Sequence, residues 1–211
     1  DVVDLSVYAE KMGFDSVWGN DHISTQHYVR AEYKTPPRYY APLLTLTAIS
    51  QHTTTLKIAT ALLVIPFRHP VVMAKEIATL DHLSGGRLLL GVGLGAYREE
   101  FEAEFGKAAK DIVRGDMFDE SIELLHRIFT EDVVSHEGKY FSLNEVQSNP
   151  KPIQKPFPFY FGGNNPKGYE RAARYGNWLP ALLTPAEIKA GCDRIKELCG
   201  QYDRDFSSVE I

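Results

Sequence analysis

Short runs of apolar residues alternate with longer amphipathic stretches along most of the chain. The apolar runs predict strands at residues 15–20, 57–65, 88–95, 159–162 and 178–183, and a further strand that begins at residue 209. Apolar residues at helical spacing predict helices at residues 2–12, 43–52, 71–83, 111–129, 167–175 and 185–201. Strands that are apolar on both faces are typical of a parallel sheet covered by helices, so the pattern predicts an α/β fold.

The repeated strand and helix units favour a TIM-type (β/α)8 barrel over an open sheet. Such a barrel usually needs about 250 residues and eight strands, whereas this sequence of 211 residues holds only five complete predicted strands. A barrel without its first and last strands would expose sheet edges, which soluble proteins rarely tolerate. We therefore expect the barrel to be truncated in this chain, with the first and last strands absent, and the sequence to be a portion of a longer protein.

Two segments interrupt the repeating units. Residues 22–42 predict a long loop whose aromatic side chains close over a ligand, with partial disorder or a contact between subunits as the alternatives. Residues 133–141 predict a hairpin that turns at Glu137-Gly138, and the prolines at 150, 152, 156 and 158 predict an extended connection after it. We expect a single domain over residues 1–211, with this hairpin and extended segment inserted near residues 133–156.

One predicted strand ends in two residues that suit proton chemistry. Asp21 and His22 follow the strand at residues 15–20, and barrel strands present reactive groups at this end. A histidine exchanges protons with ligand oxygens near neutral pH, and a neighbouring carboxylate can set which ring nitrogen carries the proton. Because adjacent residues on a strand point in opposite directions, we assign His22 to the pocket and Asp21 to its support. A strand-end histidine bonded to a backbone carbonyl is the alternative.

Another predicted strand has one packed face and one bare face. Alternation separates the apolar residues Leu88, Leu90, Val92 and Leu94 from the glycines Gly91, Gly93 and Gly95. A face without side chains lets a flat ligand approach the backbone closely. The turn from Gly162 to Pro166 leaves N–H groups unobstructed before a helix, which favours an anion, although such a turn is also ordinary connecting geometry.

Composition narrows the class of partner. The net charge is −5 and the chain has no long basic run, which argues against nucleic acid or an anionic membrane and favours a small-molecule substrate. No apolar stretch approaches the roughly 18 residues of a transmembrane helix, and the N-terminus lacks the pattern of a signal peptide, so we expect a cytoplasmic protein. Cys192 and Cys199 are too few and wrongly spaced for a zinc site, and we expect no metal.

Several motifs, taken together and in order, resemble the bacterial luciferase-like monooxygenase superfamily over about residues 1–190. They are Phe14-Asp15-Ser16-Val17-Trp18 with Asp21-His22, Pro66-Phe67-Arg68-His69-Pro70, Lys75-Glu76, Ala78-Thr79-Leu80-Asp81, Ser84-Gly85-Gly86-Arg87, the Gly91/Gly93/Gly95 strand, Phe161-Gly162-Gly163-Asn164 and Arg171-Ala172-Ala173-Arg174-Tyr175-Gly176. The resemblance implies a TIM-type barrel that binds a flavin or a 5-deazaflavin at the C-terminal rim of its strands. It also makes the missing strands expected features of the full-length protein.

The same resemblance implies which residues meet the cofactor. They are Ala61, Leu62, Gly93, Leu94, Gly95, Gly162, Gly163 and Asn164. Several relatives carry a non-prolyl cis peptide in the second of our predicted strands, and Ala61-Leu62 is the candidate pair, although small residues there also fit simple barrel packing. Relatives of the sugar-phosphate dehydrogenase kind place an acidic residue where this chain has Ala96, so the titratable candidates are His22 with Tyr97 or Glu99.

The resemblance favours the deazaflavin coenzyme F-420 as cofactor, with FMN as the alternative. The run Arg98-Glu99-Glu100-Phe101 followed by Arg114-Gly115 is similar to the deazaflavin-dependent branch, and Leu94 stands where bacterial luciferase carries a phosphate-binding arginine. The implied function is hydride transfer between reduced deazaflavin and a small organic substrate. An FMN-dependent monooxygenase that uses molecular oxygen and a non-catalytic flavin-binding barrel are the alternatives, and we expect a homodimer in each case.

Overall fold

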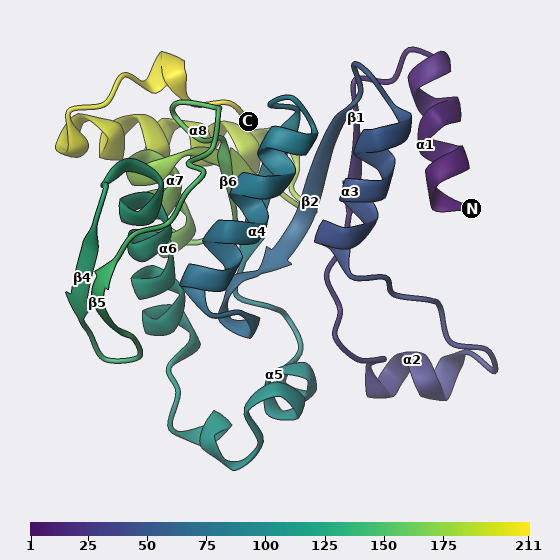
Figure 1. Cartoon of the computed structure of the whole chain (residues 1–211), viewed down its shortest axis with the longest axis horizontal. Coiled ribbons are helices and arrows are strands. Elements are labelled where there is room, and N and C mark those ends of the chain that lie inside the picture. The colour runs from purple at the N-terminus through teal and green to yellow at the C-terminus, as the bar shows by residue number, and fades with distance from the viewer.

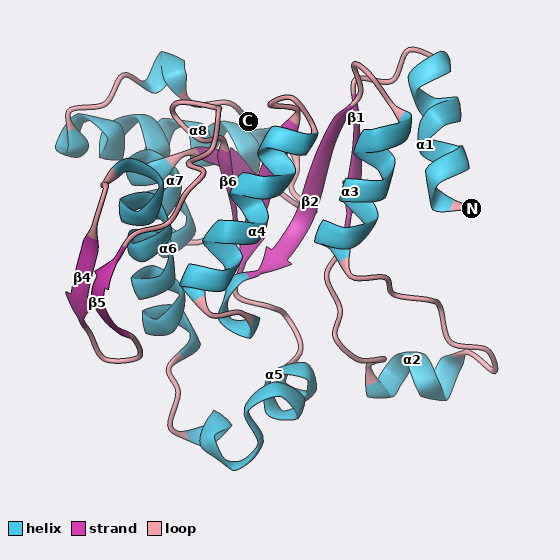
Figure 2. Cartoon of the chain, viewed as in Figure 1, coloured by secondary structure: helices cyan, strands magenta, loops and turns pink.

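In the computed structural model, which describes residues 1–211, five parallel strands form one sheet (Figures 1 and 2). Their order across the sheet is β1 (Ser16–Gly19), β2 (Lys57–Val64), β3 (Leu88–Gly93), β6 (Phe159–Gly162) and β7 (Asn177–Leu179). The prediction of five neighbouring parallel strands is therefore confirmed. The strands run in the same direction, so their C-terminal ends share one rim of the sheet.

Eight α-helices accompany the strands. They are α1 (Val2–Lys11), α2 (His27–Glu32), α3 (Pro42–His52), α4 (Pro70–Leu83), α5 (Arg98–Phe105), α6 (Arg114–Thr130), α7 (Pro166–Tyr175) and α8 (Pro185–Cys199). Six of them lie where helical spacing predicts them, whereas α2 and α5 were not expected from the sequence. Both unexpected helices lie at the end of the molecule toward which the strands point (Figure 1). None of the helices is both long and apolar enough to span a membrane.

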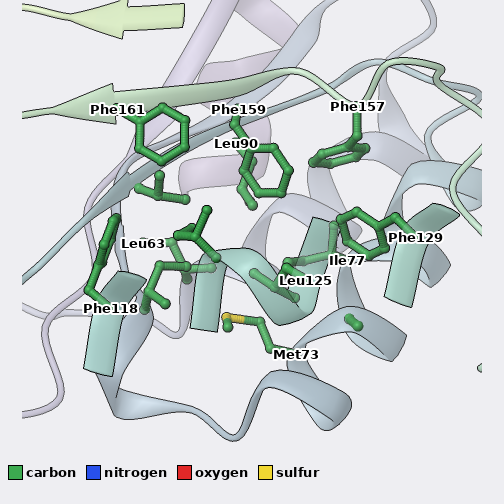
Figure 3. Packing of buried hydrophobic residues seen from close by; sticks show 14 of the residues in the cluster. Leu63, Met73, Ile77, Leu90, Phe118, Leu125, Phe129, Phe157, Phe159 and Phe161 are labelled. Carbon is green, nitrogen blue, oxygen red and sulfur yellow. The ribbon is translucent and has the colours of Figure 1, made fainter. Parts of the chain in front are cut away.

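The convex face of the sheet packs against the helices. Leu90 and Val92 of β3 are fully buried there, as the alternation predicts. Figure 3 shows Phe159 and Phe161 of β6 facing the aromatic and aliphatic side chains of α6. The ring of Phe161 lies 6.3 Å from that of Phe118, in an edge-on arrangement. Burying side chains of this size contributes about 1.5–3 kcal/mol each, so this layer holds the strands against the helices.

The sheet curves strongly across its concave face. The rings of Trp18 on β1 and Tyr160 on β6 lie 6.0 Å apart in an edge-on contact. Two strands, β2 and β3, separate β1 from β6, so in a flat sheet the backbones of β1 and β6 would lie about 14 Å apart. The two rings meet because the strands wrap around the space between them, as the wall of a barrel does.

Three predicted segments differ from the structure. The second hairpin strand, β5 (Ser142–Val146), begins after the predicted end, because Glu120 accepts the N–H groups of Tyr140 and Phe141 and keeps them from pairing with β4 (Val134–Glu137). β7 ends at Leu179, before a proline that has no N–H for a sheet ladder. No strand begins at residue 209, although the N–H of Trp178 donates to the carbonyl of Glu210 at 3.0 Å and keeps this segment beside β7.

Candidate active site

A pocket of about 550 Å³ opens at the rim formed by the C-terminal ends of the strands. Its wall combines residues from the ends of all five strands and from α5, namely Trp18, Asn20, Asp21, His22, Ala61, Leu62, Val64, Gly95, Ala96, Tyr97, Glu100, Gly162, Gly163, Leu179, Pro180 and Ala181. Small-molecule sites typically have about 300–1,000 Å³ and mostly apolar walls with a few polar groups. This pocket has that size and that composition.

The structure brings together most of the residues predicted from sequence. Those that line the pocket are Asp21, His22, Ala61, Leu62, Gly95, Gly162 and Gly163. Gly93, Leu94 and Asn164 do not line it. Leu94 packs against the hydrophobic core, and the amide of Asn164 donates to the carbonyl of Ala181 at 2.7 Å, joining the loops that follow β6 and β7. Their assignment as cofactor contacts stays a prediction.

One ring nitrogen of His22, a residue that lines the pocket, contacts side chains of the protein, and the other has no partner. Its Nδ1 lies 3.1 Å from Oε2 of Glu100 and 2.7 Å from Nε2 of Gln26. Its Nε2 has no hydrogen-bond partner in the protein and is not sealed from solvent. The alternative in which a backbone carbonyl holds the ring is wrong, because both neighbours of Nδ1 are side chains. Neither Glu100 nor Gln26 was among the predicted site residues.

A neighbouring carboxylate was expected to set which nitrogen of His22 carries the proton, but Asp21 does not contact the ring. Its buried carboxylate accepts from Nη1 of Arg68 at 2.6 Å and Nη2 at 3.0 Å, and from the backbone N–H of Val64 at 2.9 Å. The partners of Asp21 are therefore different from those of His22. The bidentate pair instead ties the end of β1 to the end of β2, which supports the rim beneath the pocket.

The glycine face of β3 is occupied by a side chain of the protein itself. A Cβ atom added to Gly93 would lie 2.6 Å from Cδ1 of Leu62, and one added to Gly162 would lie 2.4 Å from the same atom. A Cβ on Gly91 would lie 2.0 Å from the carbonyl oxygen of Thr60. At Gly91 and Gly93 this face is therefore filled by β2 instead of left bare, and contact of a flat ligand with Gly93 stays a prediction. Those glycines make room for β2, and Leu62 forms the floor of the pocket.

The backbone of β2 is irregular where it meets these glycines. The peptide bond between Ala61 and Leu62 is cis, as the resemblance implied, and the register between β2 and β3 shifts between Thr60 and Leu63. The irregularity turns Leu62 across the sheet toward Gly93 and Gly162. The same segment exposes Ala61 at the pocket wall.

The turn after β6 has the open backbone expected of an anion site, but one of the N–H groups at the start of α7 is already hydrogen-bonded within the protein. Gly163 has a φ of +106°, a conformation that suits glycine, and it lines the pocket. Asn165 caps α7 by accepting the N–H of Gly168 at 3.1 Å. Binding of a phosphate or ribityl chain here stays a prediction.

The segment after His22 packs against α5 at the rim. The backbone N–H of His27 donates to Glu99 at 3.1 Å, and this bond lowers the pKa of the Glu99 carboxyl. The hydroxyls of Tyr28 and Tyr97 lie 3.1 Å apart, and the ring of Tyr39 lies 4.5 Å from that of His22. Aromatic side chains of the predicted loop thus stand beside the pocket.

The structure contains no group of three or more histidine, cysteine or acidic side chains that could hold a metal ion.

Comparisons with known proteins agree with this architecture. The chain is 31% identical to the F420-dependent glucose-6-phosphate dehydrogenase of Amycolatopsis mediterranei, over 99% of this chain and 67% of the relative. It is 25% identical to the oxygenase component of the flavin-dependent trigonelline monooxygenase of Acinetobacter baylyi, over 100% of this chain and 55% of the relative.

A solved structure of an F420-dependent secondary alcohol dehydrogenase, in complex with an F420-acetone adduct, matches with a TM-score of 0.86 and 26% identity. It covers 100% of this chain, and this chain spans 62% of it. The fold is α/β with a parallel sheet, and its structural neighbours are luciferase-like TIM barrels. The family model of the luciferase-like monooxygenases matches residues 1–211, and the chain therefore belongs to that family.

Proposed function

We propose that this chain carries the cofactor and proton-transfer site of a deazaflavin-dependent oxidoreductase, which exchanges a hydride between F420 and a small organic substrate. One observation carries the proposal. His22 presents a free Nε2 to a largely apolar pocket, in a chain that is 31% identical to an F420-dependent dehydrogenase over 99% of its length. The structural match to an F420-dependent alcohol dehydrogenase supports the same assignment.

The apolar lining of the pocket and the open backbone at Gly163 support the binding of a flat cofactor. Gly163 has only Asn165 and Gly168 atoms within 4 Å of an added Cβ, the nearest at 3.4 Å, so its backbone is open to the pocket. Leu62 closes the floor, and Trp18 and Leu179 stand in the walls. The apolar surfaces would hold the rings of the cofactor, and the backbone of Gly163 would lie close to the bound molecule.

The residues of this chain would handle the proton while the bound cofactor supplies the hydride chemistry. His22 Nε2 lies at the pocket wall, where it can take a proton from a substrate hydroxyl or give one to a carbonyl oxygen. Tyr97 stands 5.8 Å from the His22 ring and bounds the same space.

Equilibrium titration with F420 and with FMN, followed by single-turnover hydride transfer, tests the proposal. We expect tighter binding of F420, and we expect His22→Ala to bind the cofactor normally while the chemical step slows by about 10²–10⁴-fold. A clear preference for FMN, or normal turnover by His22→Ala, would contradict it.

An FMN-dependent monooxygenase is the second candidate. The similarity to the oxygenase component of a flavin-dependent monooxygenase over the whole chain favours it. It would bind FMN more tightly than F420 and consume oxygen with substrate, and failure to bind either cofactor would favour the non-catalytic barrel. Assembly as a homodimer and a cytoplasmic location stay predictions, which sedimentation of the purified protein and cell fractionation would test.

A further inference from the structure

Glu100 is a buried carboxylate that faces a histidine. The residue is 2% exposed, and its Oε2 lies 3.1 Å from Nδ1 of His22. Its Oε1 accepts the backbone N–H groups of Ile23 at 3.1 Å and Ser24 at 3.3 Å. No lysine or arginine forms an ion pair with it, so His22 is its one potential cationic partner. Buried carboxylates are costly unless they are paired or hydrogen-bonded, which ties this group to the protonation of His22.

The helix that carries Glu100 is anchored independently of His22. Phe101 is 1% exposed and packs in a small apolar cluster with Val64, Phe67 and Ala109. Arg114 donates to the carbonyl of Gly95 at 2.9 Å, just before α5 begins. The position of Glu100 is therefore fixed by packing on its own side of the rim, and the carboxylate can orient a ring that comes from β1.

Gln26 competes for the same nitrogen. Its Nε2 lies 2.7 Å from Nδ1 of His22, and the residue is 1% exposed. The amide is oriented by two other bonds, because its Nε2 donates to the carbonyl of Ser24 and its Oε1 accepts from the hydroxyl of Tyr39, each at 3.3 Å. Nδ1 of a neutral imidazole holds either a proton or a lone pair, so only one of the two contacts is a hydrogen bond at any moment.

We propose that Glu100 and Gln26 are positioning residues that select which nitrogen of His22 carries the proton. When Nδ1–H donates to Glu100, Nε2 offers its lone pair to the pocket. When Gln26 donates to Nδ1, Nε2 carries the proton and points it at the pocket. The neutral ring thus has two hydrogen-bonded forms, one whose Nε2 can accept a proton and one whose Nε2–H can donate a hydrogen bond to a ligand oxygen.

The consequence for chemistry rests on the function proposed above. In the oxidation of an alcohol, the substrate O–H bond breaks and its proton moves to Nε2 of His22. A bound oxidised deazaflavin would supply the acceptor for the hydride that leaves the substrate carbon as the C–H bond breaks and the C=O bond forms. The imidazolium that results faces Glu100. In the reverse direction this imidazolium returns its Nε2 proton to the carbonyl oxygen, whereas the neutral form held by Gln26 can only donate a hydrogen bond from Nε2–H to that oxygen. We expect Glu100 to favour the first form in the resting protein.

Nitrogen-15 NMR of the histidine-labelled protein without cofactor tests the positioning role directly. Spectra are recorded at alkaline pH, where imidazoles are neutral, and His22→Ala identifies the signal. We expect Nδ1–H in the wild type and Nε2–H in Glu100→Gln, whose amide can donate to Nδ1. Glu102→Gln, an identical change on the exposed part of the same helix, should leave the signal unchanged. A wild-type signal in folded Glu100→Gln would overturn the proposal.

Two further measurements distinguish a failure of the positioning role from a variant that does not fold and from a failure of the proposed function. If Glu100→Gln does not fold, Glu100→Asp retracts the carboxylate and should reduce the Nδ1–H population, and an unchanged population there also overturns the proposal. In turnover, Glu100→Gln should lower kcat for alcohol oxidation by about 10–100-fold, as loss of a histidine-orienting partner does in metal sites, with cofactor affinity unchanged. A shifted NMR signal in a protein that transfers no hydride would support the positioning role and contradict the proposed function.

Discussion

Gly93→Ala is expected to destabilise the protein through Leu62. The new methyl group would lie 2.6 Å from Cδ1 of Leu62, which is closer than carbon atoms can approach, and 3.4 Å from its Cβ, which is an ordinary contact. The backbone at Gly93 is not left-handed, so the penalty comes from this contact alone. Overpacking of a tight site costs about 1–3 kcal/mol. For a chain of this size each kcal/mol lowers Tm by about 2–4 °C, so we expect a decrease of about 2–12 °C.

A double-mutant cycle with Leu62→Ala identifies the source of the penalty. Leu62→Ala alone removes a partly buried side chain and should cost about 2 kcal/mol, the low end of the range for leucine truncation. In the double variant the methyl group at position 93 occupies space that Leu62 has vacated. The combined cost should therefore fall short of the sum by about 1–3 kcal/mol, which is a large coupling for a contacting pair.

Urea unfolding of the four proteins measures this coupling, and Gly200→Ala provides the control. Gly200 has a φ of −61° and no atom within 4 Å of an added Cβ, so alanine there should be neutral or stabilise the protein by up to about 1 kcal/mol. Additivity of Gly93→Ala and Leu62→Ala within about 0.5 kcal/mol would refute the role assigned to Leu62.

Two other substitutions test the supports of the site and of the fold. Asp21→Asn should lower the free energy of unfolding, measured in urea, by about 3 kcal/mol. This is the low end for a broken buried pair, because the Arg68 side chain is 21% exposed. As a control, Asp15→Asn breaks an exposed pair and should lower the same free energy by less than about 1 kcal/mol. Glu10 accepts the N–H groups of residues 54–56, which lowers its pKa from 4.5 to about 2. Its stabilisation should be complete above pH 4.5 and lost as the pH falls through about 2, and Glu10→Gln should flatten that part of the stability curve.

The strands and most helices could be predicted because burial imposes a period on the sequence. Leu90, Val92 and the phenylalanines of β6 face the helices, and their spacing shows which face is buried. The short polar helices α2 and α5 gave no such signal. In α5 only Glu100 and Phe101 are buried, too few to establish a helical period over eight residues.

The partners of His22 could not be predicted, because the contact that matters is distant in sequence. Glu100 lies 78 positions from His22, and it reaches the ring only because β1 and β3 end at the same rim. Asp21, the adjacent carboxylate, was the natural candidate and points the other way toward Arg68. The sequence offers one faint signal, since Glu100 directly precedes the aromatic residue that anchors α5.

The glycines of β3 show that a strand face without side chains can be predicted from sequence, but not the group that packs against it. Alternation correctly places Gly91 and Gly93 opposite the packed leucines, and any group that fills the resulting space satisfies the pattern equally well. In the structure an irregular segment of the neighbouring strand turns Leu62 into that space. A ligand that enters the pocket therefore meets Leu62 before it meets the backbone of β3. A substitution at Gly93 should therefore affect ligand binding by moving the Leu62 side chain. The size of residue 62 should in turn determine the depth of the pocket.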